Sequence, residues 1–116
     1  IEGIWVSNHT GRQFEAGPAA SEVLPHVRDA VGPDVPVIYD SGIEGGLDIL
    51  RALALGADFV SLGRAFLYAV AAFGPRGLDH LAHILRADMI ANMTQLGVRD
   101  YAGLPGALVP GGVRPA

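Results

Sequence analysis

The 116-residue chain contains no cysteine and no lysine. The absence of cysteine excludes disulfide bonds and thiolate metal sites, and it is compatible with a reducing cytoplasm. The absence of lysine excludes Schiff-base chemistry and a lysine nucleophile within this chain. All eight basic residues are arginines, and together with 12 acidic residues they give a formal net charge of −4. This charge argues against nucleic acid as a partner, because binding to a phosphate backbone needs clustered basic residues.

The sequence also lacks a long apolar run. Half of the residues are hydrophobic, but no stretch approaches the roughly 20 apolar residues needed to cross a bilayer. The length and composition suit one domain with its own core. We therefore expect a soluble, cytoplasmic protein, with membrane association only through sequence outside this chain. The chain opens, at IEGIWVS, on what looks like a strand already under way, so we expect a piece of a longer protein.

Three short runs are rich in β-branched and aromatic residues, namely IWVS (4–7), VPVIYD (35–40) and ADFVSLG (57–63). Their nearly continuous hydrophobicity is typical of parallel strands that are covered on both faces. The spacing of apolar residues predicts helices over 18–31 and 46–55. Pro25 must lie in the first turn of the former or kink it, and Gly56 should end the latter.

A short apolar piece, AFLYAVAAF, follows the third strand, and a long amphipathic helix should then end near Gly97. The apolar stripe of this helix consists of Leu78, Leu81, Ile84, Leu85, Met89 and Met93. Its charged residues, expected on a solvated face, are Asp79, Arg86 and Asp88. No metal site is expected, because the helical histidines have no partner at metal-ligand spacing; these are His26, His80 and His83. Residues 1–100 should form the domain, and residues 101–116 a C-terminal tail rich in proline and glycine, irregular from Pro105 onward.

Strands and helices alternate along the chain, which predicts an α/β fold with a parallel sheet. Each strand is followed by polar or glycine residues: Ser-Asn-His, Asp-Ser-Gly and Gly-Arg. In a TIM (β/α)8 barrel the active site lies at the carboxyl ends of the strands, and the loops after strands 7 and 8 often hold a phosphate. If the loops 40–46 and 62–66 do so, the chain carries strands 6–8 of such a barrel. Tight βα turns alone would also explain these glycines.

Residues 7–13, SNHTGRQ, resemble the signature Ser-Asn-His-Gly-Gly/Ala-Arg-Gln of the FMN-dependent α-hydroxy-acid oxidases and dehydrogenases at six of seven positions. The similarity continues through the DSG turn and RALALGADFVSLGRAF to QLGV, and it covers residues 3–100. The resemblance implies FMN as the cofactor. It also implies oxidation of a small L-α-hydroxy acid, like lactate or glycolate, to the α-keto acid, and a homo-oligomer of four or more subunits.

The resemblance further implies roles for single residues. His9 matches the catalytic base and Arg12 the arginine that holds the substrate carboxylate, so both should bind substrate. The residues that match FMN contacts are Ser7, Asp40, Ser41, Gly42, Ile43, Glu44, Gly63 and Arg64. The family usually has glycine where Thr10 stands and arginine where Glu44 stands. We therefore expect Glu44 to turn outward and leave the phosphate to Arg64 and backbone amides.

The chemistry suits these residue types. A neutral imidazole accepts a proton near neutral pH, and a guanidinium fork matches a carboxylate. The sequence leaves open whether His9 takes the hydroxyl proton or the α-proton. Two alternatives also stay open: another phosphate-binding flavin or nucleotide barrel, and a non-catalytic fragment of a cleaved or truncated barrel. Three strands expose two unpaired edges, so we expect the rest of the barrel as a companion chain or a missing segment.

Overall fold

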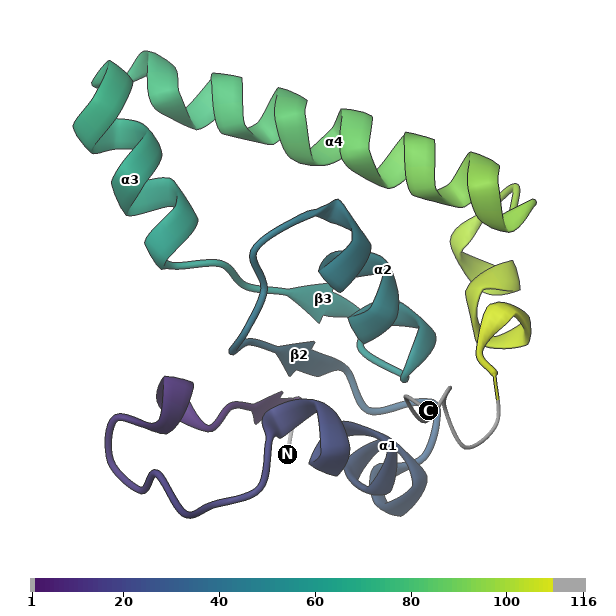
Figure 1. The fold of residues 1–116 in the computed structure, drawn as a ribbon. Coiled ribbons are helices and arrows are strands. Elements are labelled where there is room, and N and C mark those ends of the chain that lie inside the picture. Colours follow the sequence, from purple (N-terminus) through teal and green to yellow (C-terminus); the bar gives the residue numbers. More distant parts are fainter. Residues whose placement is uncertain (1, 110–116) are drawn as a thin grey trace, which may run out of the picture.

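The computed structural model describes residues 2–109, in which strands and helices alternate (Figure 1). Strands β1 (Ile4–Val6), β2 (Val37–Tyr39) and β3 (Phe59–Val60) form a parallel sheet in the order β1-β2-β3. Helix α1 (Ala20–Val31) connects β1 to β2, and helix α2 (Gly46–Ala54) connects β2 to β3. The prediction of three parallel strands with helical connections is confirmed.

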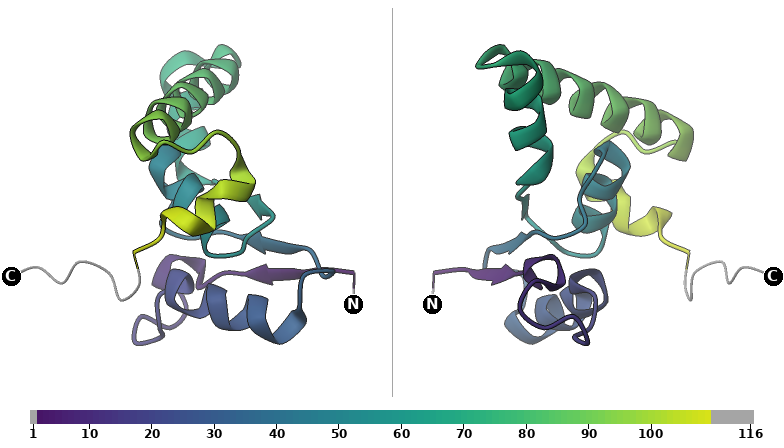
Figure 2. Two further views of the ribbon diagram at one scale, coloured as in Figure 1. Left: turned by 90° about the vertical axis from the view of Figure 1, so that its right-hand side faces the viewer. Right: turned by 60° about the vertical axis from the view of Figure 1, so that its left-hand side comes forward.

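Two further helices follow the sheet. Helix α3 (Arg64–Phe73) begins soon after β3, and the long helix α4 (Arg76–Leu96) ends at Gly97 in a left-handed conformation, as predicted. Two 3-10 helices, η1 (His9–Gly11) and η2 (Tyr101–Ala107), follow β1 and α4. Figures 1 and 2 show α1 at one end of the molecule and α3 with α4 at the other, with the sheet and α2 between them. Within residues 2–109, no helix is both long and apolar enough to span a membrane.

One face of the sheet is covered by helices. Val6, Val37 and Tyr39 are buried on this face, where α1 packs against β1 and β2. Leu24 of α1 is fully buried in the same cluster, and Ala52 of α2 extends it toward β3. The apolar stripes of two helices and the inward side chains of the strands therefore form one core.

The opposite face of the sheet carries a different row of side chains. Trp5, Ile38 and Phe59 are partners across the sheet, so they lie side by side on this face. Trp5 is 60% exposed and Phe59 is 66% exposed. Parallel sheets are normally buried on both faces, so this row requires a further layer of protein. The three βα units are thus consistent with part of a barrel whose interior this face would line.

Helix α4 differs from its sequence prediction. Leu78 and Ile84, placed on the apolar stripe, are 45% and 47% exposed, because α4 packs mainly on α2 and α3 among the described residues. Leu85 is buried, and the half-buried members of the stripe are Leu81, Met89 and Met93. Asp88 is not on a solvated face, because it is half-buried and accepts a hydrogen bond from the backbone N–H of Gly46.

Two other expectations concern Pro25 and the C-terminal tail. Pro25 is the sixth residue of α1, beyond the first turn, so the first of its two predicted positions is excluded, and its missing amide leaves the carbonyl of Ser21 without the usual helical donor. Within the expected tail, residues 101–107 form the 3-10 helix η2. Asp100 caps η2 by accepting the N–H of Gly103, and Leu104 is only 1% exposed where η2 packs on α2. Residues 110–116 of that expected tail lie outside the described residues.

Candidate functional site

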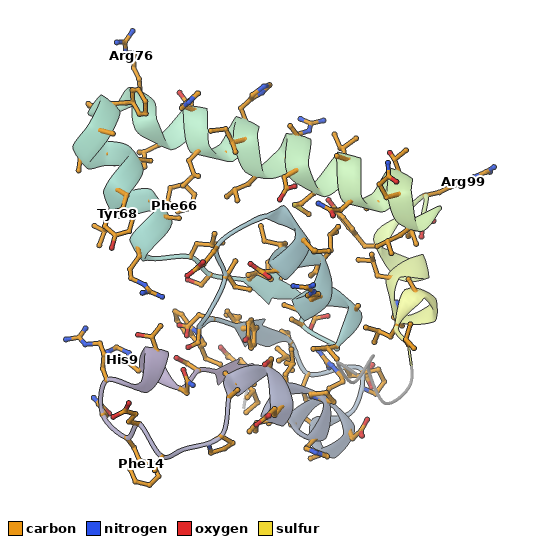
Figure 3. The ribbon with its side chains drawn as sticks, in the orientation of Figure 1. His9, Phe14, Phe66, Tyr68, Arg76 and Arg99 are labelled. Atoms are coloured by element: carbon orange, nitrogen blue, oxygen red, sulfur yellow. The ribbon has the colours of Figure 1, made fainter. Side chains whose placement is uncertain are left out.

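The carboxyl ends of the three strands meet at one edge of the sheet. Ser7, Asp40 and Ser61 occupy the row that follows Trp5, Ile38 and Phe59, because Asp40 N–H bonds to Val6 and Ser61 N–H bonds to Tyr39. Side chains alternate along a strand, so this polar row points to the same open face as the apolar row. Figure 3 shows His9 at this side of the molecule, where α3 also begins.

The carboxylate of Asp40 joins the ends of β1 and β2. It accepts hydrogen bonds from Ser7 Oγ at 2.5 Å, Trp5 Nε1 at 3.1 Å and Ser41 Oγ at 2.8 Å. Ser7 Oγ in turn accepts the backbone N–H of His9 at 3.0 Å. Asp40 and Ser7 therefore fix the position from which the His9 turn starts.

The turn itself has an unusual backbone. His9, Thr10 and Gly11 are consecutive residues with φ values of 53°, 55° and 75°. The left-handed region is unfavourable for non-glycine residues, and most of all for a β-branched one. Two hydrogen bonds offset this cost: Asn8 Oδ1 accepts the N–H of Thr10 at 2.9 Å, and Thr10 Oγ1 donates to the carbonyl of His9 at 2.7 Å. Thr10 can thus occupy the turn position at which the family signature usually has glycine.

A hollow of about 260 Å³ lies between the three strand-end loops. The predicted site residues that line it are His9, Arg12, Asp40, Ser41, Gly42, Ile43, Gly63 and Arg64. Ser7 lies in a neighbouring hollow with His9, and Glu44 is exposed and lines neither. Ser61 also lines the first hollow, although sequence reasoning did not select it. Its place at the end of ADFVS, equivalent to Ser7 and Asp40 on the other strands, was the available signal.

The two arginines of the hollow are free to meet a ligand. Within residues 2–109 the ion pairs are Arg28 with Asp58 and Arg51 with Asp48, so neither Arg12 nor Arg64 is paired there. Both arginines are exposed. An unpaired guanidinium at the mouth of a hollow suits a carboxylate or a phosphate.

The start of α3 provides free backbone donors. Gly63 is its N-cap residue and no side-chain hydrogen bond caps the helix. A Cβ on Gly63 or Gly42 would meet no described atom within 4 Å, so both glycines border open space. The first N–H groups of a helix attract an anion, and Arg64 adds a full positive charge beside them.

The amides that lead into α2 are already bound. Asp48 Oδ2 accepts the N–H groups of Glu44 at 3.1 Å and Gly45 at 3.2 Å. Asp88 of α4 accepts the N–H of Gly46 at 2.6 Å. Three successive amides are therefore already bound by carboxylates, and an anion in the hollow must use other donors.

The side chain of Tyr39 holds the loop that follows β2. Its side chain is only 5% exposed, and its hydroxyl donates to the carbonyl of Ser41 at 2.8 Å. Burial is the main cause that raises the pKa of Tyr39 above its usual value, so the hydroxyl stays protonated as a donor. This bond holds Ser41, which has a φ of 92°, in a backbone conformation that non-glycine residues rarely adopt.

Comparison with known sequences supports the family resemblance of this chain. The sequence model of the FMN-dependent dehydrogenase family matches residues 1–109. The L-lactate dehydrogenase of Chromohalobacter salexigens is 44% identical over 103 residues, which are 89% of this chain and 26% of that protein. The chain thus spans about a quarter of the length of this curated relative.

Comparison with solved structures gives similar proteins. A lactate oxidase from Pediococcus acidilactici superposes with a TM-score of 0.85 at 39% identity, over 90% of this chain and 29% of that one. An (S)-mandelate dehydrogenase, described as a monotopic membrane protein, gives a TM-score of 0.86 at 42% identity, over 93% of this chain and 29% of that one.

Proposed function

Because this chain belongs to the FMN-dependent dehydrogenase family, we propose that it forms strands 6–8 of a TIM barrel that oxidises a small L-α-hydroxy acid to the α-keto acid. The cofactor of this family is FMN. The names of the lactate dehydrogenase and lactate oxidase relatives favour a lactate-like substrate. One observation carries the proposal: His9, Arg12 and Arg64, from two different strand ends, line a single hollow.

The donors around the hollow fit the phosphate end of FMN. Arg64 supplies a cation, the start of α3 supplies uncapped N–H groups, and Ser61 supplies a hydroxyl group. Gly42 and Gly63 leave open space where a Cβ would stand. These groups would hold the phosphate.

The substrate end would be formed by His9 and Arg12. FMN, when bound, accepts the two electrons that leave the substrate. The imidazole of His9 makes no hydrogen bond among the described residues, so it is available to accept a proton from the carbinol group. The planar fork of Arg12 would bind the substrate carboxylate through two parallel hydrogen bonds and thereby orient the carbinol toward His9.

The remaining barrel units must come from other sequence, as a companion chain or as a segment of a longer protein. The exposed Trp5 and Phe59 would face the interior of the complete barrel. By resemblance the assembled protein would be a homo-oligomer. Its location stays a prediction: cytoplasmic, with any membrane contact made by sequence outside this chain. One solved relative is a monotopic membrane protein.

The test uses the assembled protein, meaning this chain together with the rest of the barrel. Bound oxidised flavin should give visible absorption near about 450 nm, a property of the cofactor itself. His9→Gln should lower kcat by about 10²–10⁴-fold while flavin stays bound, because the imidazole acts on the substrate. His83→Gln, an exposed histidine on α4, is the matched control. Near-normal turnover of His9→Gln at saturating substrate would refute the catalytic role.

Arg12→Lys tests the carboxylate contact. The variant keeps the charge and loses the fork, so the affinity for the hydroxy acid should fall by about 1–3 kcal/mol. Arg86→Lys on the exposed side of α4 is the control. An unchanged affinity in Arg12→Lys means that another residue holds the carboxylate.

A further inference from the structure

Helix α4 reaches the start of α2 through one side chain. Oδ2 of Asp88 accepts the N–H of Gly46 at 2.6 Å across 42 residues of sequence, and Asn92 Nδ2 donates to Oδ1 of Asp88 at 2.9 Å. The contact is close: a Cβ on Gly46 would lie 2.6 Å from the backbone nitrogen of Met89 and 2.8 Å from the carbonyl oxygen of Leu85. Figure 1 shows α4 crossing α2 at this end. Only glycine allows the two backbones to approach so closely.

The segment Asp40–Gly45 connects this contact to the hollow. At the β2 end, Asp40 is held by the side chains of Trp5, Ser7 and Ser41. At the α2 end, Asp48 holds the amides of Glu44 and Gly45, and Asp88 holds the next amide. The residues in between line the hollow; these are Ser41, Gly42 and Ile43.

We propose that Asp88 is a positioning residue for FMN. It fixes the first residue of α2, so that the loop between β2 and α2 presents its Gly42 and Ile43 amides to the phosphate in one arrangement. Without Asp88, the buried N–H of Gly46 loses its partner and the loop loses its anchor on α4. The inference rests on the proposed function, because it assumes that the phosphate of FMN occupies the hollow.

The test compares FMN binding by the assembled protein and its Asp88→Ala variant. The dissociation constant for FMN should rise about tenfold, the scale of one lost hydrogen bond to a charged group. The kcat at saturating FMN should stay within about twofold, because Asp88 does not touch substrate. Asp88→Asn keeps an acceptor in the same shape and should lose less affinity. Asp79→Asn, exposed on the same helix, is the matched control.

A second measurement needs no cofactor. In the FMN-free protein, hydrogen exchange at the Gly46 amide should be slow, and Asp88→Ala should accelerate it while amides in the middle of α4 stay protected. A lower melting temperature with an unchanged FMN dissociation constant means that Asp88 is only structural and overturns the inference. Unchanged exchange at Gly46 overturns it as well. If the wild-type protein does not bind FMN, the proposed function fails; if it does and the Asp88 variants match it, only this inference fails.

Discussion

Helices α2 and α3 both begin shortly after a strand, yet the backbone amides at their starts differ: those at α2 are bound by carboxylates, and those at α3 are not. At α2, the carboxylates of Asp48 and Asp88 bind three successive N–H groups. At α3, no side-chain hydrogen bond caps the helix, Gly63 precedes it, and its first residue is Arg64. One helix start is closed by negative charge, whereas the other is open and carries positive charge.

It follows that a glycine-bearing βα loop is not by itself an anion site. A helix start attracts an anion only while its amides are free, since a carboxylate of the protein competes for the same donors. The phosphate of FMN should therefore lie at the start of α3. The loop before α2 would contribute Ser41, Gly42 and Ile43, which line the hollow, but not its last three amides.

The largest expected effect on FMN binding comes from placing a carboxylate at the start of α3, as the protein does at α2. Gly63→Asp has room for its side chain, since a Cβ there meets no described atom within 4 Å. The new carboxylate should cap α3 and repel the phosphate, so FMN affinity should fall about 100-fold or more, the scale of a like-charge contact. The dissociation constant can be measured by flavin fluorescence.

Gly63→Asn is the control for this change, because it offers a similar cap without the charge. It should lose much less FMN affinity than Gly63→Asp. Equal losses would mean that the added bulk or the occupied amides matter rather than the charge. Normal FMN binding by Gly63→Asp would exclude the start of α3 as the phosphate site.

A smaller effect is expected from removing the cation at the open helix. Arg64→Ala should weaken FMN binding by about 10–100-fold, the scale of charge-assisted hydrogen bonds. Arg76→Ala provides a close control, because Arg76 is also the first residue of a helix, α4, and is exposed. Similar losses in both variants would indicate a general charge effect instead of a contact with the phosphate.

The smallest effect concerns the exposed Glu44. Glu44→Arg should leave FMN affinity unchanged or tighten it by up to about fivefold, because exposed charge pairs contribute little and salt screens them. Asp34→Arg makes the same change of charge in the loop before β2, at the opposite end of the strands, and should have no effect. Titrations of both variants at one fixed ionic strength test this. A marked loss of FMN in Glu44→Arg would reveal a binding role for this carboxylate.

Much of this molecule could be predicted from its sequence. SNHTGRQ and the segment RALALGADFVSLGRAF were enough to predict the family and its cofactor, FMN, and both are confirmed. The parallel order of the three strands followed from their hydrophobic runs and is confirmed as well. Short motifs and strand periodicity are local signals, which a sequence displays directly. The assignment to barrel strands 6–8 stays a prediction.

Contacts between distant parts of the chain could not be predicted. The bond from Asp88 to Gly46 spans 42 residues, and an acidic residue at that helical position looks like any solvated one. The network around Asp40 depends on the register of β1 and β2, which no single strand encodes. Leu104 is buried by α2, although the proline and glycine around it are typical of an irregular tail.

The most direct test of where the phosphate binds compares FMN with riboflavin, the same flavin without its phosphate. The ratio of the two dissociation constants isolates the contribution of the phosphate. In the assembled wild-type protein FMN should bind much more tightly than riboflavin, and Arg64→Ala should reduce that preference by about 10–100-fold while riboflavin affinity hardly changes. An Arg64→Ala variant that keeps the full wild-type preference for FMN would contradict the placement of the phosphate at the start of α3.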